Sequence, residues 1–243
     1  MNEEELAASL VIWIREKVVS AGCKGVVVGM SGGVDSSVVA VLSHRAFLRS
    51  MFGVLMPCYS SQEDTEHAVA VANKFSIPIK TVVLDTVFDT LLKVLPNDGI
   101  DPAVSQLAKA NLKPRLRMLT LYYFANQLEY MVVGSSNKSE LSIGYFTKYG
   151  DGGVDILPLG NLVKGQVREL ARCLGIPRQI IDKPPSGGLW PGQTDEGELG
   201  LSYEELDRYL VTSEASTKLR GKIESMIAAN NHKRLPPSVA SFL

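Results

Sequence analysis

Cysteine is scarce in this chain, which contains three cysteines among 243 residues. Cys23, Cys58 and Cys173 are odd in number and lie far apart, so the sequence gives no sign of a disulfide framework. No C-x-x-C pair and no cluster of histidine and cysteine has the spacing of a zinc site. This usage of cysteine favours a reducing, cytoplasmic compartment.

The chain also lacks a large net charge of either sign, and it lacks long apolar runs. The 25 basic side chains nearly balance the 26 acidic ones, so no overall field marks a nucleic-acid or membrane binder. The segment Asn2–Glu5 is acidic where a secretory signal is basic. No apolar run approaches the roughly 20 residues of a membrane span. We therefore expect a soluble protein that is not exported and binds neither nucleic acid nor membrane.

Hydrophobic residues are plentiful at 45%, which is enough for a large buried core. Short apolar runs alternate with helix-like stretches, and we expect strands at 26–29, 52–56, 79–84 and 131–134. This alternation predicts an α/β fold, in which a doubly wound, mostly parallel sheet carries helices on both faces. We expect residues 1–243 to form a single domain.

The sequence predicts several helices and two long loops next to them. Apolar residues recur at helical spacing near the N-terminus, and that helix is expected to end near Gly22. Another helix is expected at 164–174, and Ser202 and Glu205 form a capping box for a later one. The segments 135–158 and 183–200 are rich in glycine or proline, and loops of this length are usually functional or disordered.

A glycine-rich turn, Gly29-Met30-Ser31-Gly32-Gly33-Val34-Asp35-Ser36-Ser37, lies between an expected strand and an expected helix. Backbone N–H groups at such a turn hold an anion, and Asp35 adds an acceptor that suits Mg²⁺. The Walker A lysine is absent, and the spacing differs from that of the dinucleotide-binding fingerprint. An ordinary turn, with Ser36 or Asp35 capping the helix, is the alternative interpretation.

Three further segments carry polar side chains that suit a ligand. The segment 111–118 is expected to place cations, among them Arg115, at the start of a helix, although a solvated helix face would look similar. The segment 134–140 follows a strand and offers Glu140 as a second metal carboxylate, or as a plain surface glutamate. In 144–155, aromatic residues, Lys148 and Asp155 alternate with glycines too dense for a regular element.

The turn Ser31-Gly32-Gly33-Val34-Asp35-Ser36-Ser37 resembles the pyrophosphate-binding loop of the N-type ATP pyrophosphatases, which split ATP between the α and β phosphates. The segments 144–155 and 183–200, together with Lys164 and the terminal His232-Lys233-Arg234, resemble ammonia-dependent NAD synthetases. The resemblance runs from about Val26 to the C-terminus. It implies an adenine nucleotide alpha hydrolase-like fold and a ligase that amidates deamido-NAD with ATP and ammonia through an adenylated carboxylate.

The resemblance also implies residue roles. Asp35, Glu140 and Lys164 would be catalytic, with Asp35 and Glu140 holding Mg²⁺. The residues implied to bind ATP are Gly29, Met30, Ser31, Gly32, Gly33, Val34, Asp35, Ser36, Ser135, Lys164 and Ser186. Those implied to bind deamido-NAD are Arg115, Lys148, Asp155, His232 and Lys233. A homodimer is implied as the assembly.

Two alternatives remain open on the sequence. Another ATP pyrophosphatase, such as a GMP synthetase or a tRNA-thiolating enzyme, would share the glycine turn. A non-enzymatic ATP-binding sensor on a similar sheet would share the fold. The sequence also departs from the family pattern at Ser135, where threonine is common, and at Gly187-Gly188, which adds backbone freedom to the long loop.

Overall fold

The computed structural model describes residues 2–96, 101–190 and 192–240. Within them, four strands form one parallel sheet of order β3-β2-β1-β4. The strands are β1 (Gly25–Gly29), β2 (Met51–Leu55), β3 (Ile79–Thr81) and β4 (Tyr130–Val133). The strand that was expected at 79–84 ends at Thr81 in the structure. Val82 and Leu84 beyond its end still donate backbone hydrogen bonds to Leu55 and Pro57.

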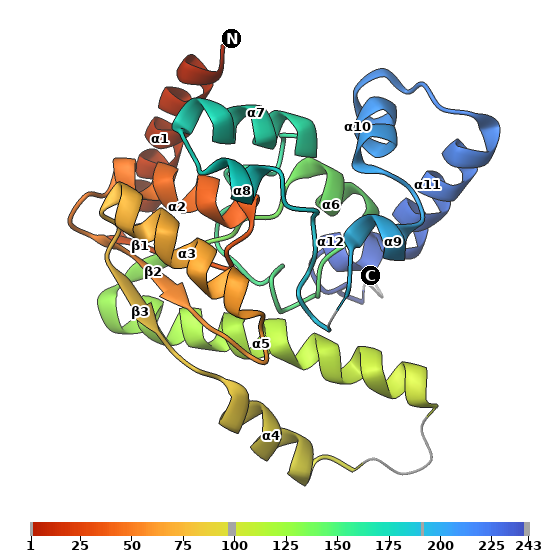
Figure 1. Cartoon of the computed structure of the whole chain (residues 1–243), viewed down its shortest axis with the longest axis horizontal. Helices are drawn as coiled ribbons and strands as arrows, with labels where there is room; N and C mark the ends of the chain where they lie inside the picture. Colours follow the sequence, from red (N-terminus) through yellow and green to blue (C-terminus); the bar gives the residue numbers. More distant parts are fainter. Residues whose placement is uncertain (1, 97–100, 191, 241–243) are drawn as a thin grey trace.

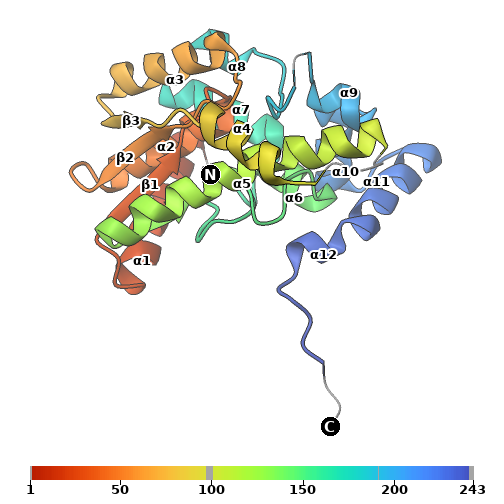
Figure 2. The same cartoon turned by 90° about the horizontal axis from the view of Figure 1, so that it is seen from below.

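Helices cover both faces of the sheet (Figures 1 and 2). One face carries α1 (Glu3–Ser20), α2 (Val34–Ala46), α3 (Gln62–Phe75), α7 (Lys164–Leu174) and α8 (Arg178–Ile181). The other face carries α4 (Asp85–Val94) and α5 (Pro102–Leu128). The doubly wound, parallel α/β prediction is confirmed.

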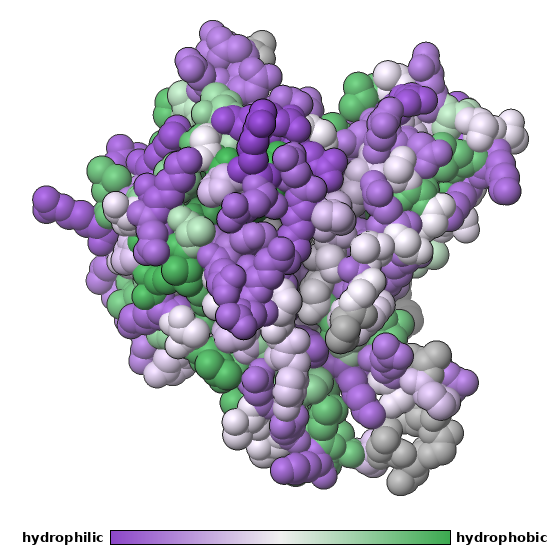
Figure 3. Space-filling model, in the orientation of Figure 1, coloured by the Kyte–Doolittle hydropathy of each residue, from purple (hydrophilic) through white to green (hydrophobic). Residues whose placement is uncertain are grey.

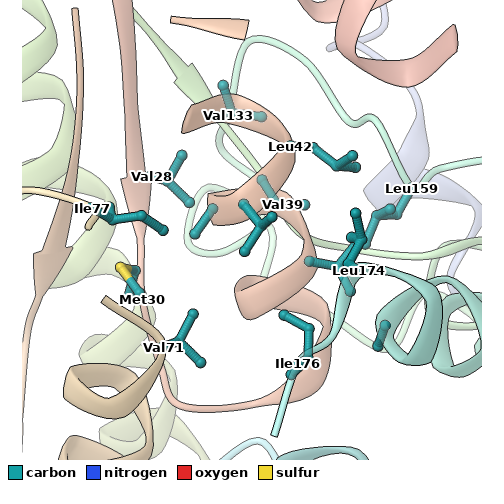
Figure 4. Packing of buried hydrophobic residues seen from close by; sticks show 14 of the residues in the cluster. Val28, Met30, Val39, Leu42, Val71, Ile77, Val133, Leu159, Leu174 and Ile176 are labelled. Carbon is teal, nitrogen blue, oxygen red and sulfur yellow. The ribbon is translucent and has the colours of Figure 1, made fainter. Parts of the chain in front are cut away.

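Strand residues alternate between two hydrophobic clusters. Val26 and Val28 of β1 pack toward α2, whereas Val27 between them packs toward α5. Figure 4 shows the first cluster, where Val28 and Val39 meet between the sheet and its helices. Burial on both faces explains why the strands read as continuous apolar runs in the sequence.

The C-terminal part adds a third cluster beside the sheet. The short helix α6 (Lys138–Ile143) packs with α9 (Asp195–Leu199), α10 (Tyr203–Thr212) and α11 (Thr217–Ala229) through Ile143, Tyr203, Leu206 and Ile223. Figures 1 and 2 show this group, with α12 (Asn231–Arg234), on the opposite side of the molecule from β3. The helices α6 and α9 lie inside segments that the sequence predicted as loops.

The segment 111–118 does not start a helix, and this prediction is wrong. It lies in the middle of α5, which begins at Pro102 and keeps Pro114 inside it. Proline lacks an N–H and is common in the first turn of a helix, but α5 accommodates Pro114 in its interior. Arg115 therefore projects from a helix interior, and the N-terminus of α5 lies more than three turns away.

The surface in Figure 3 is mostly hydrophilic, with hydrophobic patches near α4. Within the described residues, no helix is both long and apolar enough to cross a membrane. All three cysteines are free; Cys58 is buried and Cys173 is exposed.

Candidate active site

The order of the strands determines where a ligand can enter. The chain runs from β1 outward through β2 to β3 and then returns to the other side of β1 as β4. The carboxyl ends of β1 and β4 therefore meet at the point where the strand order reverses, which is the usual ligand site of open α/β sheets. The glycine turn follows β1, and the segment Ser135–Glu140 follows β4.

The glycine turn leaves the start of α2 without a side-chain cap. Gly33 is the N-cap residue and has no side chain to accept from the first turn of the helix, although its own N–H donates to the Ser31 hydroxyl at 3.3 Å. The hydroxyl groups of Ser36 and Ser37 instead donate to the Gly33 carbonyl oxygen, at 3.0 and 2.8 Å. The alternative that Ser36 or Asp35 caps the helix is therefore wrong. The first backbone N–H groups of α2 are available for an anion.

Gly32 lets this turn approach α3 closely. Its φ is 86°, and a Cβ built on it would lie 2.1 Å from the carbonyl oxygen of Asp64. Asp64 is in the first turn of α3. A side chain at Gly32 would therefore strain the backbone and push the turn away from α3.

We predict that Gly32→Ala destabilises the protein by at least about 2 kcal/mol, because strain and overlap add. Gly33→Ala is the matched control, since its Cβ would meet only the Ser31 hydroxyl, at 3.4 Å. That neighbouring change should cost about 1 kcal/mol or less. Urea unfolding of both variants measures the difference, and equal destabilisation would contradict this account of Gly32.

Three charged side chains from three helices converge beside the glycine turn. The Lys164 Nζ atom lies 2.5 Å from Asp35 Oδ2 and 3.2 Å from Glu140 Oε1. Asp35 is in the first turn of α2, Glu140 is in α6 and Lys164 is the first residue of α7. The lysine is 2% exposed, so this is a buried cluster in which one cation faces two carboxyl groups. The structure thus brings together all three residues predicted to be catalytic.

Asn137 fixes the geometry of this cluster, and sequence reasoning missed it. Its side chain is fully buried, and Nδ2 donates to Asp35 Oδ1 at 2.9 Å. Its Oδ1 accepts from the Glu140 backbone N–H, while Glu140 Oε2 accepts from the Asn137 N–H. This reciprocal pair is a capping box. The Asn-x-x-Glu spacing was the available signal for both α6 and the orientation of Glu140.

The pKa values of Glu140 and Lys164 are strongly shifted in this cluster. The pKa of Glu140 is raised to about 7, because burial and the neighbouring Asp35 raise it more than Lys164 lowers it. Burial alone lowers the pKa of Lys164, but Asp35 and Glu140 outweigh it and the pKa is raised. Lys164 is therefore a cation at neutral pH. With both carboxyl groups ionised, the cluster is one positive charge short of neutrality.

This charge deficit predicts how Glu140 affects stability. A raised carboxyl pKa means that the stability contributed by Glu140 is present below about pH 4.5 and is lost as pH rises through about 7. Glu140→Gln removes this dependence and keeps the capping box, since glutamine also serves there. In metal-free buffer, the variant should gain stability relative to wild type between pH 5 and 8. A difference in unfolding free energy that is constant over this range would contradict the burial of an ionisable Glu140.

The lid segment, defined as residues 183–200, lies over the same region, and Pro191 within it is outside the described residues. Lys183 Nζ contacts Asp64 Oδ1 at 2.8 Å and Glu63 Oε2 at 2.6 Å. Lys113 Nζ, on α5, donates to the Leu189 carbonyl oxygen at 2.9 Å. The segment is thus attached to the helices on both sides of the glycine turn.

Four of the five residues predicted to bind deamido-NAD line one cavity of about 330 Å³. The lining residues are Asn111, Arg115, Phe146, Thr147, Lys148, Tyr149, His232 and Lys233. Lys148 Nζ donates to the His232 carbonyl oxygen at 2.5 Å, and Arg115 Nε donates to the Lys148 carbonyl oxygen at 3.4 Å. The cavity is basic and has aromatic walls.

Asp155, the fifth, does not line this cavity. Its carboxylate accepts from the Val132 backbone N–H at 2.7 Å and from the Tyr122 hydroxyl at 2.8 Å. Ser135 directly follows Gly134 at the end of β4 and is partly buried. Ser186 is exposed in the lid segment, where its hydroxyl accepts from the Gly188 N–H. Ser186 is thus part of the lid segment and not of the glycine turn.

The fold defines an α/β protein with an adenine nucleotide alpha hydrolase-like architecture. The NAD synthase family model matches residues 6–237, and the chain belongs to that family. An NH(3)-dependent NAD(+) synthetase of Carboxydothermus hydrogenoformans is 49% identical over 98% of both chains.

Solved structures agree with this assignment. NMN synthetase from Francisella tularensis has 34% identity and a TM-score of 0.92, with 100% of both chains covered. NH3-dependent NAD synthetase from Campylobacter jejuni has 28% identity and a TM-score of 0.81, covering 99% of this chain and 100% of that one.

Proposed function

We propose that the chain is a ligase that converts deamido-NAD to NAD with ATP and ammonia. The observation that carries this proposal is the buried cluster of Asp35, Glu140 and Lys164 beside an uncapped helix N-terminus. The names of the similar curated proteins supply the substrate and the nitrogen donor. A carboxylate oxygen of deamido-NAD attacks the α phosphorus of ATP, pyrophosphate leaves, and ammonia then displaces AMP to form the amide.

The chain contributes positioning and charge to this reaction. The backbone N–H groups after Gly33 hold the leaving pyrophosphate, and Lys164 offsets negative charge that develops on the phosphates. No side chain acts as nucleophile, because the substrate carboxylate attacks directly. The lid segment excludes water, which would otherwise hydrolyse the adenylate.

Asp35 and Glu140 suit Mg²⁺, which usually takes one or two carboxylates together with substrate phosphates. Both carboxyl groups offer hard oxygen donors beside Lys164, and with both ionised the cluster is one positive charge short of neutrality. The described residues hold no group of three or more metal-ligating side chains, so phosphate and water oxygens would complete the shell. When bound, the ion offsets charge on the phosphates.

The basic cavity is the proposed site for deamido-NAD. Arg115, Lys148 and Lys233 offer cations to its pyrophosphate and carboxylate, and Phe146 and Tyr149 offer ring faces to a base. We keep the assignment of Asp155 to the same substrate as a prediction. Its position beside Tyr122 puts it next to α5, the helix that also carries Arg115.

One assay tests the proposal. Purified protein receives ATP, Mg²⁺, ammonium and deamido-NAD, and the formation of NAD, AMP and pyrophosphate is followed. A parallel reaction offers nicotinate mononucleotide, because one similar structure is an NMN synthetase. We expect equal amounts of NAD and AMP and a clear preference for deamido-NAD. Binding of ATP without turnover would instead indicate a sensor, and turnover with xanthosine monophosphate would indicate a GMP synthetase.

We predict that the protein uses ammonium and not glutamine. Glutamine use requires an activated cysteine nucleophile, whereas burial raises the pKa of the Cys58 thiol and so disfavours its thiolate. Raising pH from about 7 to about 9 at fixed ammonium should lower the apparent ammonium requirement, since only neutral ammonia attacks. Efficient NAD formation from glutamine by ammonia-free protein would contradict this prediction.

We also propose that two copies associate through α5. Arg115, Leu119 and Tyr123 follow one another at intervals of four residues, so they lie along one face of the helix. Leu119 is 64% exposed and Tyr123 is 59% exposed, which is a large apolar area beside the Arg115 end of the basic cavity. Symmetric dimers are the commonest assembly. Sedimentation should show a dimer that Leu119→Glu converts to monomers; a monomeric wild type would refute the proposal.

We propose that the enzyme acts in the cytoplasm. Its three free cysteines, one of them exposed on α7, are compatible with a reducing compartment.

A further inference from the structure

The lid segment reaches the Lys164 cluster through the side chain of Tyr203. We propose that Tyr203 is a positioning residue that couples closure of the lid segment to the placement of the Lys164 ammonium group. The proposal rests on the function proposed above. Tyr203 belongs neither to the glycine turn nor to the lining of the basic cavity.

The aromatic ring of Tyr203 lies against the ammonium group of Lys164. The Lys164 Nζ atom lies 5.0 Å from the centre of the Tyr203 ring, within the range of a cation–π interaction. The side chain is 2% exposed, so the ring also keeps water from this side of the lysine. Tyr203 is the first residue of α10, directly after the Ser202 capping box, which fixes its backbone.

The other end of Tyr203 holds the lid segment. Its hydroxyl donates to Asp195 Oδ2 at 3.0 Å, and its backbone N–H donates to Glu196 Oε1 at 2.8 Å. Asp195 and Glu196 open α9, inside the lid segment. Asp195 is 4% exposed, and its backbone N–H donates to the Pro185 carbonyl oxygen at 3.0 Å. The lid segment thus folds back on itself, so that Pro185 contacts Asp195, the residue that accepts the hydrogen bond from Tyr203.

A second tyrosine binds the same carboxylate. The Tyr145 hydroxyl lies 3.2 Å from Asp195 Oδ1 and 2.9 Å from Glu198 Oε2, and Gln193 Nε2 donates to the same Glu198 oxygen. Tyr145 belongs to the segment that also contributes Phe146 to the basic cavity. The lid segment and the cavity wall therefore meet at Asp195, which is linked to Lys164 through the Tyr203 ring.

This arrangement makes the position of Lys164 depend on the lid segment. When the segment leaves, Asp195 leaves with it, and the Tyr203 hydroxyl loses its acceptor. The ring is then free to turn, and one wall of the lysine becomes accessible to water. A buried hydroxyl without a partner is costly, so the closed segment and the ordered ring stabilise each other.

Tyr203→Phe tests the coupling, since it keeps the ring against Lys164 and removes only the hydroxyl. Tyr209→Phe is the matched control on the same helix, because its hydroxyl binds Glu224, outside the lid segment. We expect Tyr203→Phe to lower kcat about tenfold, which corresponds to the loss of one hydrogen bond to a charged acceptor. The KM for deamido-NAD should change little, because the cavity lining is intact.

Two further readouts separate coupling from ordinary stability. Hydrogen exchange of the lid segment with bound ATP analogue should rise in Tyr203→Phe and not in Tyr209→Phe. The ratio of AMP to NAD formed should rise above one, because water then reaches the adenylate. Asp195→Ala, which removes the acceptor of the Tyr203 hydroxyl, should reproduce both changes, and Tyr203→Phe should have no further effect in the Asp195→Ala background.

Equal AMP-to-NAD ratios and equal exchange in Tyr203→Phe and Tyr209→Phe would overturn the proposal, whatever the unfolding temperatures. Additive losses in the double variant would do so as well. Failure of the proposed function has a different signature, since the wild-type protein would then form no NAD at all.

Discussion

Lys164→Gln is expected to lower kcat for pyrophosphate release by about 10²–10³-fold, the loss typical of one preorganised electrostatic group. The reason is that Lys164 is the cation between Asp35 and Glu140 and is held there with 2% exposure. Without it, the two carboxyl groups face each other, and the phosphates of ATP meet negative charge. Steady-state measurement of pyrophosphate release at saturating substrates gives kcat.

A loss of folding must be separated from a loss of charge in this variant. Lys164→Arg keeps the positive charge and should recover part of the rate, and circular dichroism reports whether each variant is folded. Lys24→Gln is a control for loss of an ion pair, since the Lys24 side chain is 65% exposed and bonds Glu129 at 2.8 Å. Surface pairs contribute little, so this change should leave kcat unaltered. An active Lys164→Gln enzyme would contradict the assignment of Lys164.

Asp35→Asn is expected to reduce pyrophosphate release by a similar factor of about 10²–10³ while leaving the fold intact. The substitution preserves volume, but it removes the negative charge that bonds Lys164 and would hold the metal. The amide keeps only one acceptor oxygen, so it cannot accept from both Asn137 Nδ2 and Lys164 Nζ as the Asp35 carboxylate does.

The Mg²⁺ dependence of this variant gives the sharper result. The concentration of Mg²⁺ for half-maximal rate should rise, and saturating Mg²⁺ should not restore the wild-type rate. Asp182→Asn, at an exposed position on the surface, is the control and should behave like wild type. Wild-type turnover of Asp35→Asn at saturating Mg²⁺ would contradict a role for Asp35 in binding the metal.

The sheet was predictable because its strands are buried on both faces. Short apolar runs such as 26–29, which are bounded by glycine, are typical of strands that are buried on both faces. The ends of elements were less predictable: α6 has six residues, too few for helical periodicity, and Pro114 hid the continuity of α5. The capping box of Asn137 and Glu140 was the one local signal that would have revealed α6.

The candidate site was predictable in its residues but not in its connections. The glycine turn and the resemblance to NAD synthetases selected Asp35, Glu140 and Lys164, which the structure brings within hydrogen-bonding distance. Asn137 and Tyr203 were missed, because their roles depend on contacts between segments far apart in the sequence. Asn137 Nδ2 reaches Asp35 across 102 positions, and no local pattern encodes such a pair.

The most direct test of carboxylate activation follows an oxygen atom. Deamido-NAD labelled with ¹⁸O in its nicotinate carboxylate is incubated with the protein, ATP, Mg²⁺ and ammonium, and the products are analysed by mass spectrometry. If the carboxylate attacks the α phosphorus, each AMP carries one ¹⁸O and the pyrophosphate carries none. Label in pyrophosphate, release of ADP and phosphate, or unlabelled AMP formed together with NAD would contradict formation of an adenylate on the carboxylate.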